Sequence, residues 1–367
     1  MTIKHLKSLG LFGGASLNYV ETAVADTDGL DIREVKRTRQ FVYPEKLCLD
    51  IRQIIAKRGL TLSEMEQNPQ IAELEAEITD FYARIIQNEL EKENIDIIGV
   101  DGLTILNNPA EKCSYQLEKG HELSRLLQRK IITHFHKADL LSGGQASPLS
   151  PAFFGAIGQN LPKPTLFINL DAVCSLIFLH ETGEIIAFDC APCMAMIEDW
   201  TFRHANMLTD YNGKLAATGK NHQQITESLL HHKILQKQPP KSLDIMCFAD
   251  KKEHLEGLSL EDGAATATSF IAQAIKKAAD TFLTEKPEYI YLSGAGTKNP
   301  SLVRQIKHFF APFTVCKLSD FYKFDESVGA QITAFNAVRR LNGLPITYPT
   351  TTGAYEPMSG GEIFDEK

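Results

Sequence analysis

One aspartate has the position expected of a general base. Asp189 ends a predicted strand over 185–189 and directly precedes the Cys-Ala-Pro-Cys run 190–193. A carboxylate at the C-terminal end of a strand, beside a helix start, can accept a proton from water or a hydroxyl group. The same position also suits an aspartate that caps a helix or closes a turn. The sequence alone leaves both interpretations open.

Cysteines and histidines nearby suggest other chemistry, which the spacing does not favour. A redox pair at Cys190 and Cys193 would need a thioredoxin-like βαβ unit near the chain start, and none is predicted. A zinc site would need a second Cys or His pair at suitable spacing, and nothing ties His134, His136 or residues 231–232 to the cysteines. We therefore expect buried, inert thiols, packed or hydrogen-bonded histidines on a strand, and no metal site.

Three glycine-rich turns each follow a predicted strand, at 10–16, 142–145 and 293–299. Glycine allows positive φ and close backbone approach, which a phosphate or sugar needs from main-chain N–H groups. Three such junctions favour a nucleotide or sugar site. The P-loop pattern is absent, and no Gly-x-Gly-x-x-Gly run opens a helix with a suitable acid downstream, so a Rossmann domain is disfavoured.

The strands and helices predicted around these residues follow one order that occurs twice along the chain. Hydrophobic periodicity predicts strands over 8–12, 19–25, 95–100, 131–136, 165–170, 174–180, 185–189 and 289–293, and helices over 71–91, 194–206, 263–283 and from 300 onward. A long helical stretch is expected between the second strand and residue 91, broken near Gly59 and Asn68. The same order of strands, a hairpin and helices occurs twice along the chain, which indicates a two-domain α/β protein.

Length and composition agree with this and exclude several classes of protein. The 367 residues suit two domains, and 43% apolar residues rule out disorder across the chain. A net charge of −8 argues against a general nucleic-acid binder and against attraction to an anionic membrane. Seven scattered cysteines suit a reducing compartment, and no apolar run is long enough to span a bilayer. Polar residues interrupt the apolar stretch near the N-terminus, so we expect a cytoplasmic protein rather than a secreted one.

Together these residues resemble the anhydro-N-acetylmuramic acid kinases, bacterial enzymes of the sugar kinase–Hsp70–actin superfold that recycle cell-wall sugars. The matching segments are 9–11, 98–104, 139–153, 188–192 with Trp200, 239–242, 294–302, 334–337 and 352–354. The Gly-Gly-Gln-x-x-Pro-Leu-x-Pro-Ala-Phe run and the Phe-Asp-Cys-x-Pro run are the most specific. The resemblance implies an α/β, two-domain, ribonuclease H-like fold with an interdomain cleft. We expect an N-terminal domain at 1–130, a C-terminal domain at 131–350, and a tail at 351–367 that packs on the first domain.

The resemblance also implies a reaction, a phosphotransferase reaction with an alcohol acceptor. ATP with Mg²⁺ phosphorylates O6 while the 1,6-anhydro ring of an anhydro-amino sugar opens, giving N-acetylmuramate 6-phosphate for peptidoglycan turnover. An aspartate at the position of Asp189 activates the water that attacks C1. The residues implied for the substrate are Asp101, Thr104, Gly143, Gly144, Gln145 and Pro148, and those implied for the nucleotide are Gly13, Gly14, Ser16, Asn18, Asn169, Gly294, Gly296 and Asn299. A homodimer is also expected.

The polar residues of both implied sites depart from the family pattern. The family hairpin Ser-Gly-Thr-Ser-x-Asp-Gly-x-Asp is replaced at 13–21, and the family's Asn-Ile-Gly-Gly reads Asn169-Leu-Asp171-Ala172. The family's His-Gly-Gln-Thr begins here with Asp101, and its Asp-Phe-Arg ends here with His136. An acid where phosphate should approach predicts ATP binding weaker than in the family members.

Three functions follow from this mixture of matches and departures. Retention of Asp189 and the Gly-Gly-Gln run favours the family reaction. Loss of glycine and hydroxyl residues at both phosphate hairpins favours a catalytically impaired relative that serves as a binding or regulatory protein. A kinase of altered sugar specificity is the third. The first is our prediction.

Overall fold

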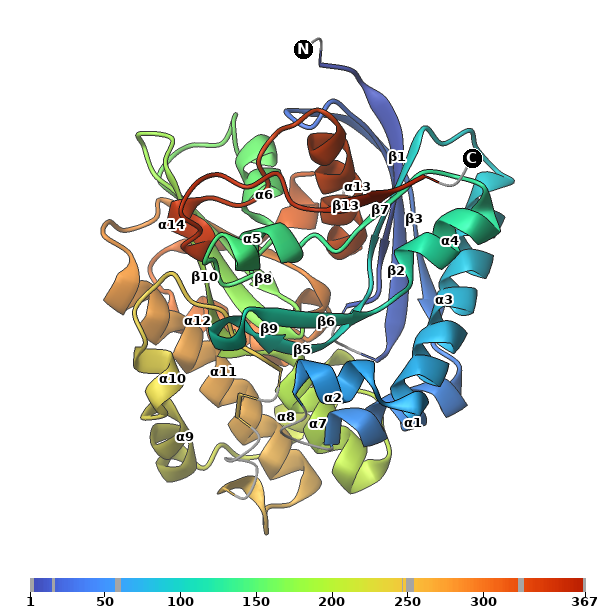
Figure 1. The fold of residues 1–367 in the computed structure, drawn as a ribbon. Helices are drawn as coiled ribbons and strands as arrows, with labels where there is room; N and C mark the ends of the chain where they lie inside the picture. Colours follow the sequence, from blue (N-terminus) through green and yellow to red (C-terminus); the bar gives the residue numbers. More distant parts are fainter. Residues whose placement is uncertain are drawn as a thin grey trace. The chain divides into compact units, whose positions relative to one another are not determined.

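The computed structural model describes residues 3–14, 17–56, 61–245, 247–248, 254–322 and 327–365 (Figure 1). The chain divides into two compact units. The first contains Met1–Ala156, Ser327–Tyr348 and Ala354–Lys367, and the second contains Ile157–Glu326 and Pro349–Gly353. This division differs from the border expected at residue 130. Strand β7 (Ile131–Thr133) pairs with strand β4 (Ile97–Asp101) of the first unit, and this pairing keeps the residues after 130 in that unit.

The first unit is built on a six-stranded sheet in the order β13-β7-β4-β1-β2-β3. Its other strands are β1 (Leu6–Phe12), β2 (Tyr19–Thr27), β3 (Ile32–Val42) and β13 (Glu362–Phe364), and a separate hairpin pairs β5 (Leu103–Asn108) with β6 (Cys113–Leu117). Its helices are α1 (Glu45–Ala56), α2 (Leu62–Glu66), α3 (Pro69–Leu90), α4 (Gly120–Leu127), α5 (Lys137–Leu141) and α13 (Val328–Leu341), with α6 (Pro151–Ile157) ending at the border.

The second unit is built on a five-stranded sheet in the order β10-β9-β8-β11-β12. The strands are β8 (Thr165–Leu170), β9 (Val173–Leu179), β10 (Ile185–Pro192), β11 (Tyr289–Ser293) and β12 (Thr314–Lys317). The helices are α7 (Met194–Ala205), α8 (Lys214–Thr218), α9 (Gln223–Leu230), α10 (Lys233–Gln236), α11 (Leu260–Phe282), α12 (Pro300–Phe309) and α14 (Pro349–Thr352).

Both sheets share one topology. In each, the first three strands in chain order form an antiparallel meander. A fourth strand pairs in parallel with the first strand, and a fifth pairs in parallel with the fourth. The order is therefore 3-2-1-4-5 in both units, with β13 as an extra edge strand on the first. This repeated order is the ribonuclease H-like arrangement, so the predicted α/β, two-unit fold is confirmed.

Close helix–sheet packing explains two glycines of the first sheet. A Cβ atom on Gly10 of β1 would lie 2.0 Å from the carbonyl oxygen of Ala330 in α13. A Cβ atom on Gly99 of β4 would lie 2.8 Å from the carbonyl oxygen of Thr333 in the same helix. Only glycine lets α13 lie this close to the sheet, because any larger residue would force the backbones apart.

Three predicted elements are corrected. Strand β3 lies where a helix was expected. All of its residues are half-buried or exposed, so its sequence lacks the apolar alternation that would indicate a strand. The strand predicted over 131–136 ends at Thr133, because His134 adopts a left-handed φ of 55°. Helix α11 begins at Leu260 and runs through Gly263, where a Cβ atom would lie 2.0 Å from the Trp200 ring.

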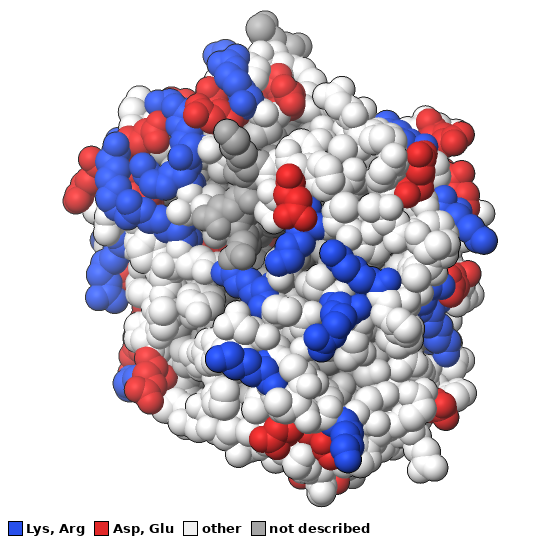
Figure 2. Space-filling model, turned by 180° about the vertical axis from the view of Figure 1, so that it is seen from behind, with Lys and Arg blue, Asp and Glu red and all other residues white. Residues whose placement is uncertain are grey.

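The surface carries charges of both signs. On the face drawn in Figure 2, basic side chains stand beside acidic ones or singly on uncharged surface, and they do not form one continuous basic band there. Within the described part of the chain, no helix combines the length and the apolar character needed to cross a membrane.

Candidate functional site

Asp189 lies near the end of β10, at a β-bulge. The register of β10 against β9 shifts between Asp189 and Ala191, which bends the strand beside the aspartate. The Ser175 hydroxyl donates to Oδ1 at 2.7 Å, and the Leu243 backbone N–H donates to Oδ2 at 3.0 Å. Cys193, not Asp189, stands at the N-cap position of α7, so the helix-cap interpretation is wrong. A carboxylate has about four acceptor sites, so it can hold both bonds and still accept a proton.

The cysteines around Asp189 are buried thiols. Cys174, Cys190 and Cys193 are all fully buried. Burial raises the pKa of the Cys174 and Cys193 thiols well above the ordinary value. A thiol held in its protonated form is a poor nucleophile and a poor metal ligand. The predicted burial of Cys190 and Cys193 is therefore confirmed, and the raised pKa of Cys193 agrees with an unreactive thiol there.

The residues predicted for the nucleotide in the second unit lie at the ends of neighbouring strands. Asn169 of β8 is paired with Ser293 of β11, whose hydroxyl donates to the Asn169 side chain at 3.0 Å. Gly294 follows with φ 83°, and a Cβ atom there would lie 2.7 Å from the carbonyl oxygen of Leu170. A Cβ atom on Gly296 would lie 2.7 Å from the Leu170 side chain. Both glycines are thus required by close packing on β8.

Asn299 has a structural role and a spare donor. Its Oδ1 atom accepts the Leu302 N–H at 3.1 Å and caps α12. Its Nδ2 group is buried and finds no hydrogen-bond partner among the residues that the structure describes. A buried donor without a partner is costly, so an acceptor supplied by a ligand would satisfy it. This fits a nucleotide at the 294–299 turn.

Asp171 and Ala172 form the turn between β8 and β9, which the resemblance predicts to approach the phosphates. The Ala172 N–H donates to Asp171 Oδ1 at 3.1 Å, and the Met194 N–H donates to the Asp171 carbonyl oxygen at 3.0 Å. The hairpin turn is therefore held against the first turn of α7. Burial raises the pKa of the Asp171 carboxyl, with the Ala172 N–H opposing the shift. An acid thus occupies the place where the resemblance expects a glycine.

In the first unit, the hairpin glycines contact the predicted substrate segment. The Gly13 N–H donates to the Asp101 carbonyl oxygen at 2.8 Å, and the Thr104 N–H donates to the Gly14 carbonyl oxygen at 3.3 Å. A Cβ atom on Gly13 would lie 2.3 Å from the Tyr82 hydroxyl, and Gly14 has φ 67°. Asn18 is buried, and Ser16 falls outside the described residues. The structure thus brings Gly13, Gly14, Asp101 and Thr104 together.

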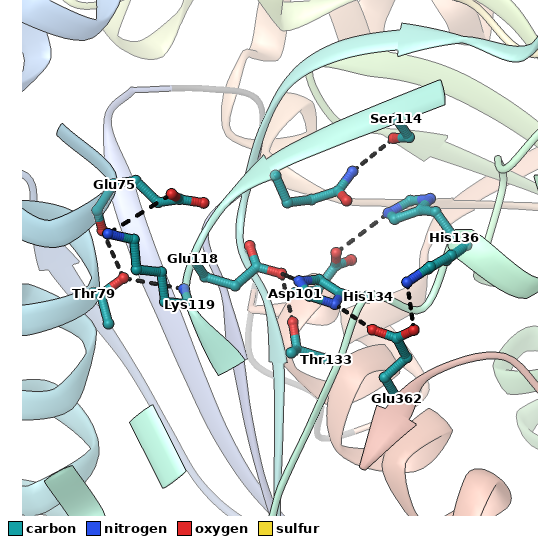
Figure 3. A network of polar contacts seen from close by, with 12 residues as sticks. Glu75, Thr79, Asp101, Ser114, Glu118, Lys119, Thr133, His134, His136 and Glu362 are labelled. Carbon is teal, nitrogen blue, oxygen red and sulfur yellow. Dashed lines mark hydrogen bonds and ion pairs between the residues drawn. The ribbon is translucent and has the colours of Figure 1, made fainter. Parts of the chain in front are cut away.

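Asp101 pairs with His136, one of the two histidines expected to be packed or hydrogen-bonded (Figure 3). His136 Nε2 lies 3.3 Å from Asp101 Oδ1, and His136 Nδ1 donates to the Ala146 carbonyl oxygen at 2.8 Å. Burial alone would lower the pKa of His136, but the Asp101 carboxylate and the Ala146 carbonyl raise it above the ordinary value. Both ring nitrogens face acceptors, so the imidazolium form fits this position. In the sequence, His136 stands where the family's Asp-Phe-Arg motif has its arginine, and this position could have indicated that His136 belongs to the site.

The Gly-Gly-Gln loop is held by a buried aspartate. Asp139 Oδ1 accepts the Ala146 N–H at 2.8 Å. A Cβ atom on Gly144 would lie 2.0 Å from the same oxygen, and Gly143 has φ 79°. Both glycines are therefore dictated by the loop, while Gln145 is half-buried and Pro148 is buried. Because Ala146 also accepts from His136, this loop and Asp101 belong to one network.

A buried glutamate beneath Asp101 carried no signal in the sequence. The Glu118 side chain is fully buried, and its Oε2 atom fills the space that a Cβ atom on Gly102 would need. Thr133 Oγ1 donates to Glu118 Oε1 (Figure 3). Burial raises the pKa of Glu118 well above its ordinary value; the Thr133 hydrogen bond opposes this, and the Asp101 charge adds to it. The carboxyl is therefore held toward its neutral form.

The predicted site residues thus form two groups, one on each unit. Asp189, Asn169, Gly294, Gly296 and Asn299 belong to the second unit, and the remaining described ones belong to the first. Among the described residues, no three His, Cys, Asp or Glu side chains are arranged to hold a metal ion.

Known proteins match this chain along nearly its full length. The family model described as anhydro-N-acetylmuramic acid kinase matches residues 6–366. The anhydro-N-acetylmuramic acid kinase of Paramagnetospirillum magneticum is 32% identical over 361 residues, covering 96% of this chain and 98% of that protein. The protein of the same description from Rhodopseudomonas palustris is 33% identical over 364 residues, covering 97% and 98%. A solved structure, component A of the (R)-2-hydroxyglutaryl-CoA dehydratase of Acidaminococcus fermentans, matches with a TM-score of 0.46 and 12% identity, covering 92% of this chain and 99% of that chain. The match along nearly the full length places this chain in the anhydro-N-acetylmuramic acid kinase family.

Proposed function

We propose that this chain is a kinase of 1,6-anhydro-N-acetylmuramic acid. It uses ATP to open the anhydro ring and to phosphorylate O6, giving N-acetylmuramate 6-phosphate and ADP. The observation that carries the proposal is Asp189, a carboxylate held by two hydrogen bonds at a strand bulge in a chain that belongs to this kinase family. The family match also favours this function over a catalytically impaired relative.

The proposed reaction balances around Asp189. Water attacks C1, the C1–O6 bond breaks, and one proton of the water passes to the Asp189 carboxylate. The released O6 takes the γ-phosphoryl group of ATP, and ADP leaves. Asp189 then returns its proton to solvent. The hydrogen bonds from Ser175 and Leu243 fix the carboxylate, so little orientational freedom is lost when the water is bound.

Residues of both units would bind the substrates. Asn169, Gly294, Gly296 and Asn299 are proposed for the nucleotide, together with the hairpin residues Gly13, Gly14, Ser16 and Asn18. Asp101, Thr104, Gly143, Gly144, Gln145 and Pro148 are proposed for the sugar. Mg²⁺ would enter with the phosphates, because this ion keeps most of its water and binds proteins through few side chains. We also infer a homodimer that acts in the cytoplasm.

The proposal is tested by incubating the protein with 1,6-anhydro-N-acetylmuramic acid and Mg²⁺-ATP. We expect ADP to form in step with the sugar phosphate, and N-acetylglucosamine in place of the anhydro sugar to give neither. ADP release that ignores the anhydro sugar would contradict the proposal.

A further inference from the structure

Lys241 is fully buried although it carries an ammonium group. Its Nζ atom donates to the carbonyl oxygen of Leu235 in α10 at 3.0 Å. It lies 4.5 Å from the ring centroid of Phe282 in α11 and 5.8 Å from that of Phe188 in β10. The ammonium group therefore contacts three elements of the second unit, of which α10 and α11 are neighbours in Figure 1. Hydrogen bonding and cation–π attraction compensate part of the cost of burying its charge.

The backbone around Lys241 holds Asp189 at two points. The Asp189 N–H donates to the Lys241 carbonyl oxygen at 3.0 Å. Two residues later, the Leu243 N–H donates to Asp189 Oδ2 at 3.0 Å. Residues 241–243 therefore run beside the end of β10 and fix both the backbone and the carboxylate of Asp189. Together with the Ser175 hydroxyl, which donates to Oδ1, this short segment fixes where the carboxylate points.

We propose that Lys241 is a positioning residue for Asp189. Its buried charge anchors residues 241–243 between α10, α11 and β10, and this anchor holds the Asp189 carboxylate in the orientation that takes a proton from water. The inference rests on the proposed function, since it assigns Asp189 the role of base. Lys241 acts through the backbone and not on the substrate.

The anchor depends on the charge of Lys241. Burial lowers the pKa of Lys241 to about 8; Cys190 and Asp189 of β10 favour its charge, and Lys237 opposes it. Helix α10 faces the ammonium group with a carbonyl oxygen and α11 faces it with an aromatic ring. The charge is therefore present at neutral pH and is lost as the pH rises through about 8. Turnover should fall over the same interval.

The kinetic test compares Lys241→Met, Lys241→Arg and a matched lysine. Lys276→Met is the control, because the Lys276 ammonium group of α11 also lies over a phenylalanine ring, 5.7 Å from the Phe310 centroid, but pairs with Asp280 of its own helix. We expect Lys241→Met to lower kcat about 10- to 100-fold with little change in KM for ATP, and to lose the alkaline fall. Lys241→Arg should move the alkaline fall to higher pH, because arginine stays charged. Replacing a buried charge by an apolar residue of similar volume often leaves stability unchanged, so Lys241→Met should fold.

A second readout does not need turnover. Exchange of the Asp189 amide proton reports directly on its hydrogen bond to the Lys241 carbonyl oxygen. We expect its protection, corrected for intrinsic rates, to drop in the unmodified protein as the pH passes about 8 and to persist in Lys241→Arg. If the unmodified protein has no kinase activity, the proposed function fails while amide exchange still decides the anchoring. Unchanged protection across this pH interval, or wild-type kcat in a folded Lys241→Met variant, would overturn the inference.

Discussion

The Asp189 carboxylate accepts hydrogen bonds from Ser175 and Leu243, and an amide in its place could keep both. In Asp189→Asn the amide oxygen can accept from Leu243, and the NH₂ group can donate to the Ser175 hydroxyl, which rotates to suit. The variant should fold, while loss of the proton acceptor should lower kcat by ~10²–10⁴-fold. Steady-state kinetics with a thermal-melt control checks this. Turnover near that of the unmodified protein would mean that Asp189 only closes a turn.

Asp171 is the residue that should most weaken nucleotide binding. A carboxylate near the β- and γ-phosphates costs on the order of 1–4 kcal/mol, which is about ten- to several-hundred-fold in affinity. Burial raises the pKa of Asp171, so its charge is lost as the pH falls through that raised value. Asp171→Asn should bind ATP more tightly, and Asp171→Gly with Ala172→Gly more tightly still.

Calorimetry across pH checks the charge argument. The affinity gap between the unmodified protein and Asp171→Asn should close toward low pH, whereas adenosine should bind both alike. Micromolar Mg²⁺-ATP binding by the unmodified protein would refute the argument that Asp171 repels the phosphates.

Among the secondary-structure elements, the edge strand β13 is held by ion pairs. Glu362 of β13 accepts from Lys137 at 2.6 Å and from His134 at 2.8 Å (Figure 3). Burial alone would raise the pKa of Glu362, but the bonds from Lys137 and His134 lower it overall. A carboxyl with a lowered folded-state pKa stabilises the fold at neutral pH, and this contribution is lost as the pH falls through that value.

Glu362→Gln should therefore lower the melting temperature at neutral pH by about 1–3 °C, a modest effect because the pair is partly exposed. The difference should vanish under acid conditions. Glu122→Gln is the matched control, because Glu122 pairs with an exposed residue of its own helix, Arg125. Scanning calorimetry of both variants measures the effect. A pH-independent shift would show that Glu362 stabilises β13 without its charge.

The elements also show why some of the fold was predictable. Strands buried on both faces, such as β8, appear in the sequence as continuous apolar runs. Strand β3 is half-exposed and offers no such run, so it was missed. The same contrast holds for the site. The glycines of its tight turns could be recognised in the sequence, whereas the burial of Glu118 and Lys241 could not be predicted from it. Burial of a charged side chain is decided by packing between distant segments, and no local pattern records it.

Hydrogen exchange along the whole molecule tests the proposed sugar site. Peptides 139–149, from the first unit, and 186–194, from the second, should both gain protection from hydrogen exchange when the anhydro sugar is added. The comparison is made with and without the ligand at one pH. Protection confined to other peptides would move the sugar site away from the Gly-Gly-Gln loop and Asp189.

We propose that ring opening by water and phosphorylation of O6 occur together in this one protein. Mass spectrometry of the product formed from 1,6-anhydro-N-acetylmuramic acid and Mg²⁺-ATP tests it most directly. We predict a product heavier than the substrate by one phosphoryl group and one molecule of water, formed in equal amount with ADP and largely absent with Asp189→Asn. A product that gains the phosphoryl group but no water, or the absence of any phosphorylated sugar, would contradict it.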